Sequence, residues 1–220
     1  MILGDDLVQR VVVYIDGFNL YYGLREKKWQ RYYWLNIHSL SEKLLSPRQE
    51  LIRVRYFTAR IVNSPKDPEK IKRQDAYIEA LEMLPGVSVH FGKFSPRKRT
   101  CFTCGARWNT YEEKMTDVNI AVEMLSDAQD NRFDTAIIVS GDSDLVGPIR
   151  AVRKRYPQKQ LAVAFPPRKR CKPTSKELRK YASYNFRIGS KNCLTASSQS
   201  ILPSPMAIFY RARPNGVEAP

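Results

Sequence analysis

The sequence predicts an α/β fold in which helices cover both faces of a central, mostly parallel sheet. The 220 residues, 43% of them hydrophobic and 11% aromatic, suffice for one compact domain with a real core. Short apolar runs alternate along the chain with stretches of helical period. Strands that alternate with helices pair in parallel through right-handed crossovers, and this places helices on both faces of the sheet.

The strands are predicted from β-branched and aromatic runs that end in turn residues. The first run occupies residues 11–15 and is followed by Gly17, which is typical of a strand buried on both faces. In the second, at residues 51–61, Arg53 and Arg55 are expected to alternate outward. Further strands are expected at residues 87–91, 135–140 and 160–165, with an edge strand at 185–188.

Helices are predicted at residues 67–84, 145–155 and 175–182, where apolar side chains recur at helical spacing. A further helix carries Asp117. Thr110 and Glu113 form a capping box that would start this helix early and place Asp117 in its second turn. The face expected to be buried consists of Val118, Ala121, Val122, Leu125 and Ala128. The domain is expected to span residues 10–189, with a basic loop at 95–110 and a tail at 190–220.

Basic residues outnumber acidic ones, 37 to 22, and the formal net charge is +15. Between Arg150 and Lys191, fourteen Lys and Arg residues accompany one acid, Glu177. A surplus this concentrated favours a polyanionic partner such as nucleic acid over a merely solvated face. The residues expected to contact nucleic acid are Arg97, Lys98, Arg99, Arg150, Arg153, Lys154, Arg168, Lys169 and Arg170.

Several classes of protein are excluded by what the sequence lacks. It has no P-loop and no G-x-G-x-x-G motif, and its two histidines, His38 and His90, lie beside no obvious nucleophile. An aspartyl phosphatase needs a second Asp two residues after Asp16, where Phe18 stands. No apolar run reaches the roughly 18 residues of a membrane span, and the first residues do not form a signal peptide. We therefore expect a cytoplasmic protein without a membrane partner, because four cysteines are also too few for a disulfide scaffold.

Acidic residues follow two of the best-defined strands. Asp16 ends the first strand, and Asp142 and Asp144 follow the strand at 135–140. The carboxyl ends of parallel strands meet at one edge of the sheet, so we expect these carboxylates to converge there. Asp117, at the start of an amphipathic run, could face the same crevice. Asn19 and Ser140 would add neutral oxygen atoms to this group.

Clustered carboxylates repel one another, so a divalent ion that neutralises them is the natural explanation for keeping them together. Oxygen ligands of these kinds suit Mg²⁺ or Mn²⁺ and not zinc. Each acid taken alone has a simpler interpretation. Asp16 can belong to a turn, Asp144 can cap a helix, and Asp117 can compensate a helix dipole. If all three simpler interpretations were correct, acids would have to occur by coincidence at three separate places in the sequence. The metal site is therefore the favoured interpretation.

Three segments carry a resemblance to a known family. They are Val13-Tyr14-Ile15-Asp16-Gly17-Phe18-Asn19-Leu20-Tyr21, Lys114-Met115-Thr116-Asp117-Val118-Asn119 and Val139-Ser140-Gly141-Asp142-Ser143-Asp144-Leu145. In this order they resemble the NYN (LabA-like) domains of the PIN-like nuclease superfamily. The resemblance implies a PIN-like three-layer α/β/α sandwich and a metal-dependent ribonuclease. It also implies that Asp16, Asp117, Asp142 and Asp144 bind the metal, with Asn19, Ser140 and Asn119 as supporting polar residues.

The activity expected from this resemblance is hydrolysis of RNA within the chain, with one or two Mg²⁺ or Mn²⁺ ions orienting a water for in-line attack. Two alternatives stay open. The domain can be a non-catalytic RNA-binding or regulatory module, or a structure-specific DNA nuclease that uses the same metal chemistry. Single-stranded RNA is the expected partner, and a homodimer is compatible with the sequence.

Aromatic residues follow the first acidic motif closely: Tyr21, Tyr22, Trp29, Tyr32, Tyr33 and Trp34. Some of them can stack on the bases of a single strand. The simpler interpretation, which we favour for most of them, is that they fill the core or cover a helix.

Two of the four cysteines, Cys101 and Cys104, stand in a Cys-x-x-Cys-Gly segment with basic flanks, the form of a zinc knuckle. It is half a zinc site, and the candidates to complete it are His90, Cys171 and Cys193. Unliganded thiols are the alternative. Redox chemistry fits poorly, because a redox pair normally opens a helix after a strand.

Overall fold

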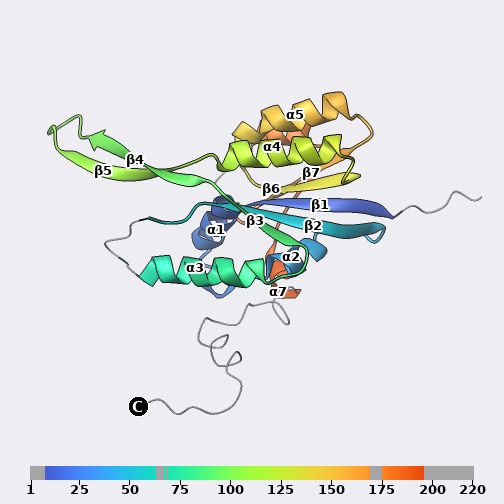
Figure 1. Ribbon diagram of the computed structural model, residues 1–220, viewed down its shortest axis with the longest axis horizontal. Coiled ribbons are helices and arrows are strands. Elements are labelled where there is room, and N and C mark those ends of the chain that lie inside the picture. The colour runs from blue at the N-terminus through green and yellow to red at the C-terminus, as the bar shows by residue number, and fades with distance from the viewer. Residues whose placement is uncertain (1–7, 63–66, 68, 169–174, 196–220) are drawn as a thin grey trace, which may run out of the picture.

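The computed structural model describes residues 8–62, 67, 69–168 and 175–195. Six parallel strands form the central sheet in the order β3-β2-β1-β6-β7-β8 (Figure 1). Their bounds are β1 (Gln9–Asp16), β2 (Gln49–Thr58), β3 (Val87–Phe91), β6 (Thr135–Val139), β7 (Gln160–Phe165) and β8 (Tyr184–Arg187). The strands predicted at 87–91 and 160–165 match residue for residue, and the others agree within a few residues.

Helices cover both faces of the sheet, which confirms the predicted α/β/α sandwich (Figure 1). One face carries α1 (Gly17–Glu26), α2 (Ile37–Glu42), α3 (Glu69–Glu82) and α7 (Ser190–Thr195), with a 3₁₀ turn at Gln30–Tyr32. The other face carries α4 (Thr116–Gln129), α5 (Val146–Arg155) and α6 (Lys176–Tyr181), and a 3₁₀ turn at Ser143–Leu145 precedes α5. No helix within the described ranges is long and apolar enough to cross a membrane.

The core is split into two clusters by the sheet, and β1 contributes to both. Val11, Val13 and Ile15 pack beneath α1, α2 and α3, whereas Val12 and Tyr14 pack beneath α4 and α5. All five side chains are at most 2% exposed. The continuous apolar run is therefore explained by burial on both faces, as predicted.

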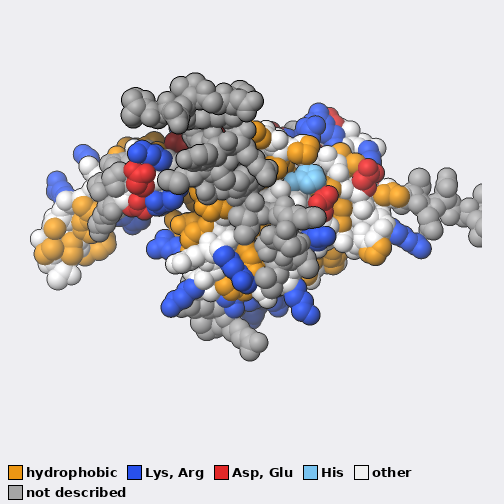
Figure 2. Space-filling model, turned by 90° about the horizontal axis from the view of Figure 1, so that it is seen from below, with side chains coloured by type: hydrophobic (Ala, Val, Ile, Leu, Met, Phe, Trp, Pro, Cys, Tyr) orange, Lys and Arg blue, Asp and Glu red, His pale blue; other side chains and the backbone are white. Residues whose placement is uncertain are grey.

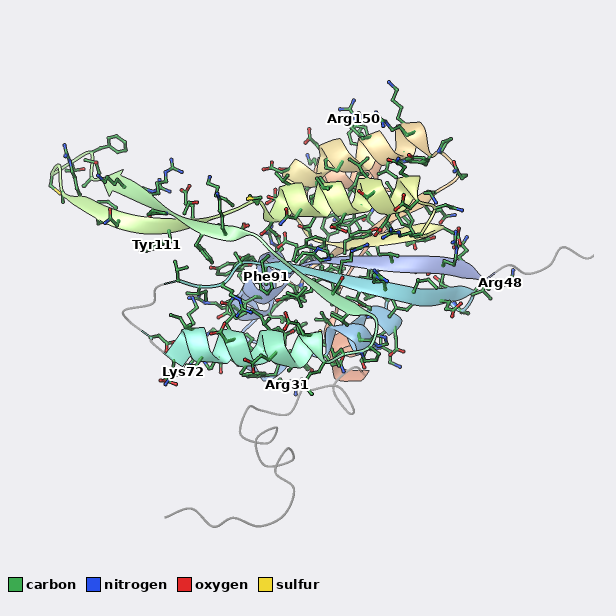
Figure 3. All side chains as sticks on the ribbon, in the orientation of Figure 1. Arg31, Arg48, Lys72, Phe91, Tyr111 and Arg150 are labelled. Carbon is green, nitrogen blue, oxygen red and sulfur yellow. The ribbon has the colours of Figure 1, made fainter. Side chains whose placement is uncertain are left out.

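The segment expected to be a basic loop at 95–110 is instead part of an antiparallel hairpin, which corrects that prediction. Its strands are β4 (Lys93–Thr100) and β5 (Arg107–Lys114), and the hairpin projects away from the sandwich (Figure 1). Its side chains stand clear of the body along most of its length (Figure 3). Because neither strand has a face buried in the core, the sequence shows none of the apolar alternation that normally reveals a strand.

The start of α4 was also predicted wrongly. Thr110 and Glu113 belong to β5, and the helix begins only at Thr116, so Asp117 lies in its first turn. The buried face is shifted as well. Ile120, Met124 and Ala128 pack against the sheet, whereas Val118 and Val122 are 59% and 55% exposed.

Arg55, expected to face outward from β2, is buried at 4% exposure. Its guanidinium donates two hydrogen bonds of 2.7 Å to the Asp127 carboxylate, and Tyr14 donates a third of 2.7 Å. The side chain faces α4, and the acids of that helix neutralise it. An isolated strand pattern cannot reveal such a partner, because Asp127 lies 72 residues further along the chain.

Candidate metal site at the sheet edge

The predicted acids lie at the point in the sheet where the strand order changes direction, between β1 and β6. From β1 the chain builds β2 and β3 on one side, and later β6, β7 and β8 on the other. The carboxyl ends of β1 and β6 therefore flank the point at which open parallel sheets bind their ligands. Asp16 is the last residue of β1, and Ser140 follows the last residue of β6.

Asp16 is only 3% exposed and is held by three hydrogen bonds. The backbone N–H of Asn19 donates to Oδ1 at 2.9 Å, which makes Asp16 the N-cap of α1. The Asn19 side-chain amide and the Ser140 hydroxyl donate to Oδ2 at 2.6 and 3.0 Å. Burial raises the pKa of Asp16, and these hydrogen bonds oppose the rise.

The close approach of α1 to β2 is possible because residue 17 is a glycine. A Cβ atom at Gly17 would lie 2.6 Å from the Tyr56 ring and 2.7 Å from the backbone oxygen of Phe57. No side chain fits there without displacing the strand. Gly17 thus allows the helix to begin directly after Asp16, so that Asn19 reaches the carboxylate.

Asp142 and Asp144 are tied to the same network. The Ser140 hydroxyl accepts the backbone N–H of Asp142 at 3.1 Å while it donates to Asp16. The Asn19 side-chain oxygen accepts the backbone N–H of Gly141 at 3.3 Å. Asp142 in turn caps the 3₁₀ turn before α5 by accepting the N–H of Asp144 at 3.1 Å. Ser140 and Asn19, both expected as supporting residues, thus link the ends of β1 and β6.

Asp117 joins these acids from α4. Its pKa is raised to about 7, first by burial and then by the negative charges of Asp142, Asp16, Glu113 and Asp144. The structure therefore places Asp117 within electrostatic reach of the other three predicted aspartates. Glu113 is a fifth carboxylate that the sequence analysis did not select.

This raised pKa predicts how the metal-free protein responds to pH. The unfolded chain releases the Asp117 proton near pH 3.8, whereas the folded protein keeps it until about pH 7. The contribution of Asp117 to the free energy of unfolding is therefore expected to fall as pH rises from about 4 to about 7, because its carboxyl keeps its proton in the folded state there. Asp117→Asn should flatten this fall, as measured by urea denaturation in EDTA at several pH values. Equal slopes for both proteins would show that Asp117 is not crowded by other acids.

The donor set suits a hard divalent cation, because it consists of carboxylate, amide and hydroxyl oxygens. Repulsion among the acids, visible in the pKa of Asp117, would be relieved by such an ion. As the side chains lie, no three His, Cys, Asp or Glu residues of the described ranges are grouped closely enough to hold one metal ion.

Asn119 and the expected nucleic-acid-binding cations occupy several different places. The Asn119 side chain donates to the backbone oxygen of Phe91 at 3.1 Å and so fastens α4 to β3. Arg168 lies at the acidic edge, 3.9 Å from the Cβ position at Gly141. On α5, on the outer side of its layer (Figure 3), Arg150 packs over Tyr181 and Arg153 donates to the Tyr181 backbone oxygen. Lys154 is exposed on the same helix, and Lys169 and Arg170 lie outside the described residues.

The hairpin holds the remaining predicted residues. Arg97 and Arg99 both pair with Glu112 across the two strands, and Lys98 is exposed. Cys101 and Cys104 form the turn at the hairpin tip. Neither Cys193 nor His90 is placed to join them, since Cys193 is buried in the core and the His90 ring stacks on Phe57. Cys171 lies outside the described residues.

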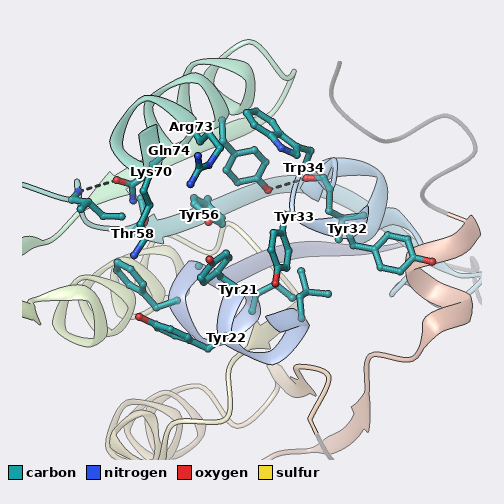
Figure 4. Close-up of a pocket in the computed structure, with 17 residues that line it drawn as sticks. Tyr21, Tyr22, Tyr32, Tyr33, Trp34, Tyr56, Thr58, Lys70, Arg73 and Gln74 are labelled. Carbon is teal, nitrogen blue, oxygen red and sulfur yellow. Dashed lines mark hydrogen bonds between the residues drawn. The ribbon is translucent and has the colours of Figure 1, made fainter. Parts of the chain in front are cut away.

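A pocket of about 170 Å³ (Figure 4) is lined by residues of α1, β2 and α3 and begins at Gly17, which follows Asp16. Five of the six aromatic residues after the first acidic motif line it, all except Trp29. Tyr32 is 1% exposed and belongs to the core, whereas Tyr22 is 50% exposed at the pocket's rim. Lys70 and Arg73 of α3 line the same pocket, and the Arg73 guanidinium pairs with Asp67. These two cations carry no signal in the sequence, because they reach the pocket only through the packing of α3.

Tyr22 also lines a second, smaller pocket of about 140 Å³ together with Asn19 and Arg168. The aromatic pocket and the acidic edge are therefore joined through α1. Phe18 contributes to both pockets and stacks on Tyr22 with ring centroids 6.4 Å apart.

Comparisons with known proteins agree with this architecture. A sequence profile of the NYN domain matches residues 10–189. The chain is 26% identical over 208 residues to 6-hydroxy-3-succinoylpyridine 3-monooxygenase HspA of Pseudomonas putida (strain DSM 28022 / S16). That alignment covers 80% of this chain but only 65% of the relative. A crystal structure of a protein of unknown function from Vibrio parahaemolyticus RIMD 2210633 superposes with a TM-score of 0.51. At 21% identity, covering 85% of this chain and 97% of the other, it shows a shared fold.

Proposed function

The chain belongs to the NYN domain family, part of the PIN-like nuclease superfamily, and on that premise we propose that it is a metal-dependent endoribonuclease. Its substrate is single-stranded RNA, and its reaction is hydrolysis of a phosphodiester bond. The observation that carries the proposal is the hydrogen-bonded network through Ser140 that joins Asp16 and Asp142 at the carboxyl ends of β1 and β6, with the charges of Asp16, Asp142 and Asp144 raising the pKa of Asp117 on α4. In a protein with a net charge of +15, such a concentration of acid calls for a cationic ligand.

The four aspartates are the residues that would hold Mg²⁺ or Mn²⁺. When bound, the ion would supply a Lewis acid to the phosphate and lower the pKa of a bound water. The protein's own contribution is orientation. Ser140 and Asn19 fix the Asp16 carboxylate through two side-chain hydrogen bonds, and Ser140 also fixes the backbone of Asp142. Asp117 would bind in its deprotonated form, so metal binding should strengthen as pH rises towards 7.

The RNA backbone is positioned by cations around this edge. Arg168 lies beside Asn19 and Gly141, next to the acids, and would contact a phosphate adjoining the scissile one. Because such contacts release counterions, RNA binding should weaken steeply as salt concentration rises.

The aromatic pocket would take a base of the bound strand. Its tyrosine walls offer stacking surfaces, and Lys70 offers positive charge to the neighbouring phosphates (Figure 4). Tyr22 is the best-placed stacking residue, since it is half exposed and borders both this pocket and the Arg168 pocket.

Tyr22→Ala is therefore expected to lower kcat/KM for single-stranded RNA by roughly 5- to 150-fold, the range for losing one stacked base. Tyr22→Phe keeps the ring and should stay within about 3-fold of wild type on the same grounds. Steady-state cleavage of a labelled oligonucleotide measures both. If the alanine and phenylalanine variants behave alike, no base stacks on Tyr22.

The function itself is tested by incubating the purified protein with matched single-stranded RNA, single-stranded DNA and flap DNA, with Mn²⁺ or with EDTA. The proposal expects internal cuts in the RNA with Mn²⁺ and none with EDTA. Cleavage of DNA in preference to RNA would favour the structure-specific DNA nuclease. Salt-sensitive RNA binding with no cleavage would favour the non-catalytic module.

A further inference from the structure

The tip of the β4–β5 hairpin carries two thiols that face each other. The Cys101 sulfur accepts hydrogen bonds from the backbone N–H groups of Thr103 and Cys104 and interacts with the Cys104 side chain, and these contacts lower its pKa. The chain turns back at Gly105, which has φ +68° and donates its N–H to the Cys101 oxygen at 2.9 Å. The turn thus presents two sulfur atoms together and favours thiolate, the form of cysteine that binds metal.

The rest of the described chain provides no ligands to complete a zinc site at this tip. A structural zinc site is tetrahedral and closed, so it needs four ligands. Over the residues that the structure describes, no third His, Cys, Asp or Glu is grouped with the pair. His90 is engaged by Arg55 and Ser88, and Cys193 is fully buried in the core.

Exposed apolar side chains surround the same tip. Phe102, between the two cysteines, is fully exposed, and Trp108 on β5 is 49% exposed. Figure 2 shows hydrophobic side chains gathered at this far end of the hairpin. Phe102 and Trp108 thus give the tip an apolar surface that contact with a second protein surface would bury.

We propose that two copies of this chain share one Zn²⁺ at their hairpin tips, bound by Cys101 and Cys104 of each copy. Four thiolates complete the tetrahedral shell, and the Phe102 rings are covered by the contact between the copies. The site carries a net charge of −2, because four thiolates surround one dication. Arg107, the first residue of β5, pairs with Thr100 at the end of β4, lies next to the tip and supplies the opposite charge. The partner is thus a second copy of the chain, and the inference is independent of the proposed nuclease activity.

The test is a zinc titration of the reduced 220-residue chain, followed by light scattering and metal analysis. We expect one zinc per two chains and a mass that halves when EDTA is added. Co²⁺ in place of zinc should give the absorption spectrum of four thiolate ligands.

Cys104→Ser is expected to lower zinc affinity at least 100-fold and to leave a monomer with an unchanged circular dichroism spectrum, because the tip is remote from the core. Cys171→Ser is the matched control and should keep both zinc and the dimer. Mixing wild type with the Cys101→Ser/Cys104→Ser variant should yield no zinc-linked mixed dimer.

Two results would overturn the proposal. One is a zinc-bound monomer with one zinc per chain, above all if Cys171→Ser abolishes it, because the site would then be completed within one chain. The other is failure of the wild-type protein to retain zinc through gel filtration.

Discussion

Asp142→Asn is expected to lower the rate of RNA cleavage at least 100-fold while leaving RNA affinity unchanged or slightly higher. The rate falls because the variant removes one of four carboxylates that would hold the catalytic ion, and electrostatic contributions of this kind are typically worth 100- to 1,000-fold. RNA affinity is not expected to fall, because the negative charge of Asp142 repels the polyanionic RNA and the substitution removes that charge. Asn remains a good N-cap, so the hydrogen bond from the Asp144 N–H that starts the turn before α5 is kept.

Single-turnover cleavage with saturating enzyme measures the rate, and filter binding in EDTA measures the affinity. Asp130→Asn is the matched control, since Asp130 lies at the other end of α4 and pairs with Arg132 at 2.8 Å. It should cleave like wild type. Equal activity in Asp142→Asn and wild type would remove Asp142 from the mechanism. An equal loss in both variants would show that the loss is not specific to the acidic edge.

Asp127→Ala is expected to lower the free energy of unfolding by about 3–5 kcal/mol, the usual cost of leaving a buried charge without its partner. Asp127 is 1% exposed and accepts two hydrogen bonds from Arg55 and one from Tyr14. Its removal would leave the buried Arg55 guanidinium with Glu123 alone among its carboxylate partners. Because these contacts anchor α4 to β1 and β2, the substitution should also loosen the helix that positions Asp117.

Urea denaturation followed by circular dichroism measures this loss. Asp130→Ala, three residues further along, removes an acid whose side chain is 47% exposed and should cost at most about 0.5 kcal/mol. A loss of less than about 1 kcal/mol for Asp127→Ala would mean that the buried pair contributes little to holding α4.

The central sheet was predictable because its strands are buried on both faces. Continuous runs such as residues 11–15 and 160–165 have no polar face and can hardly form anything other than central strands. The hairpin was not predictable in this way. Its strands pack on each other and not on the core, and they are held by cross-strand pairs such as Arg97 with Glu112.

The acidic site was largely predictable because it depends on strand ends, which parallel topology brings to one edge. Asp16, Asn19, Ser140 and Asp142 lie in one hydrogen-bonded network as a result. Contacts made by packing between distant elements could not be predicted. The Arg55–Asp127 pair and the cations of α3 in the aromatic pocket belong to this class. The only local signal for Glu113 was its position just before the Asp117 motif.

The most direct test of the account is a crystal of the protein soaked in Mn²⁺ and measured near the manganese absorption edge. We expect an anomalous peak within coordination distance of Asp16, Asp142 and at least one of Asp117 and Asp144, with the carboxylates drawn inward around it. A fully soaked crystal that shows no peak among these four aspartates, at a pH above 7 where Asp117 is ionised, would contradict the account.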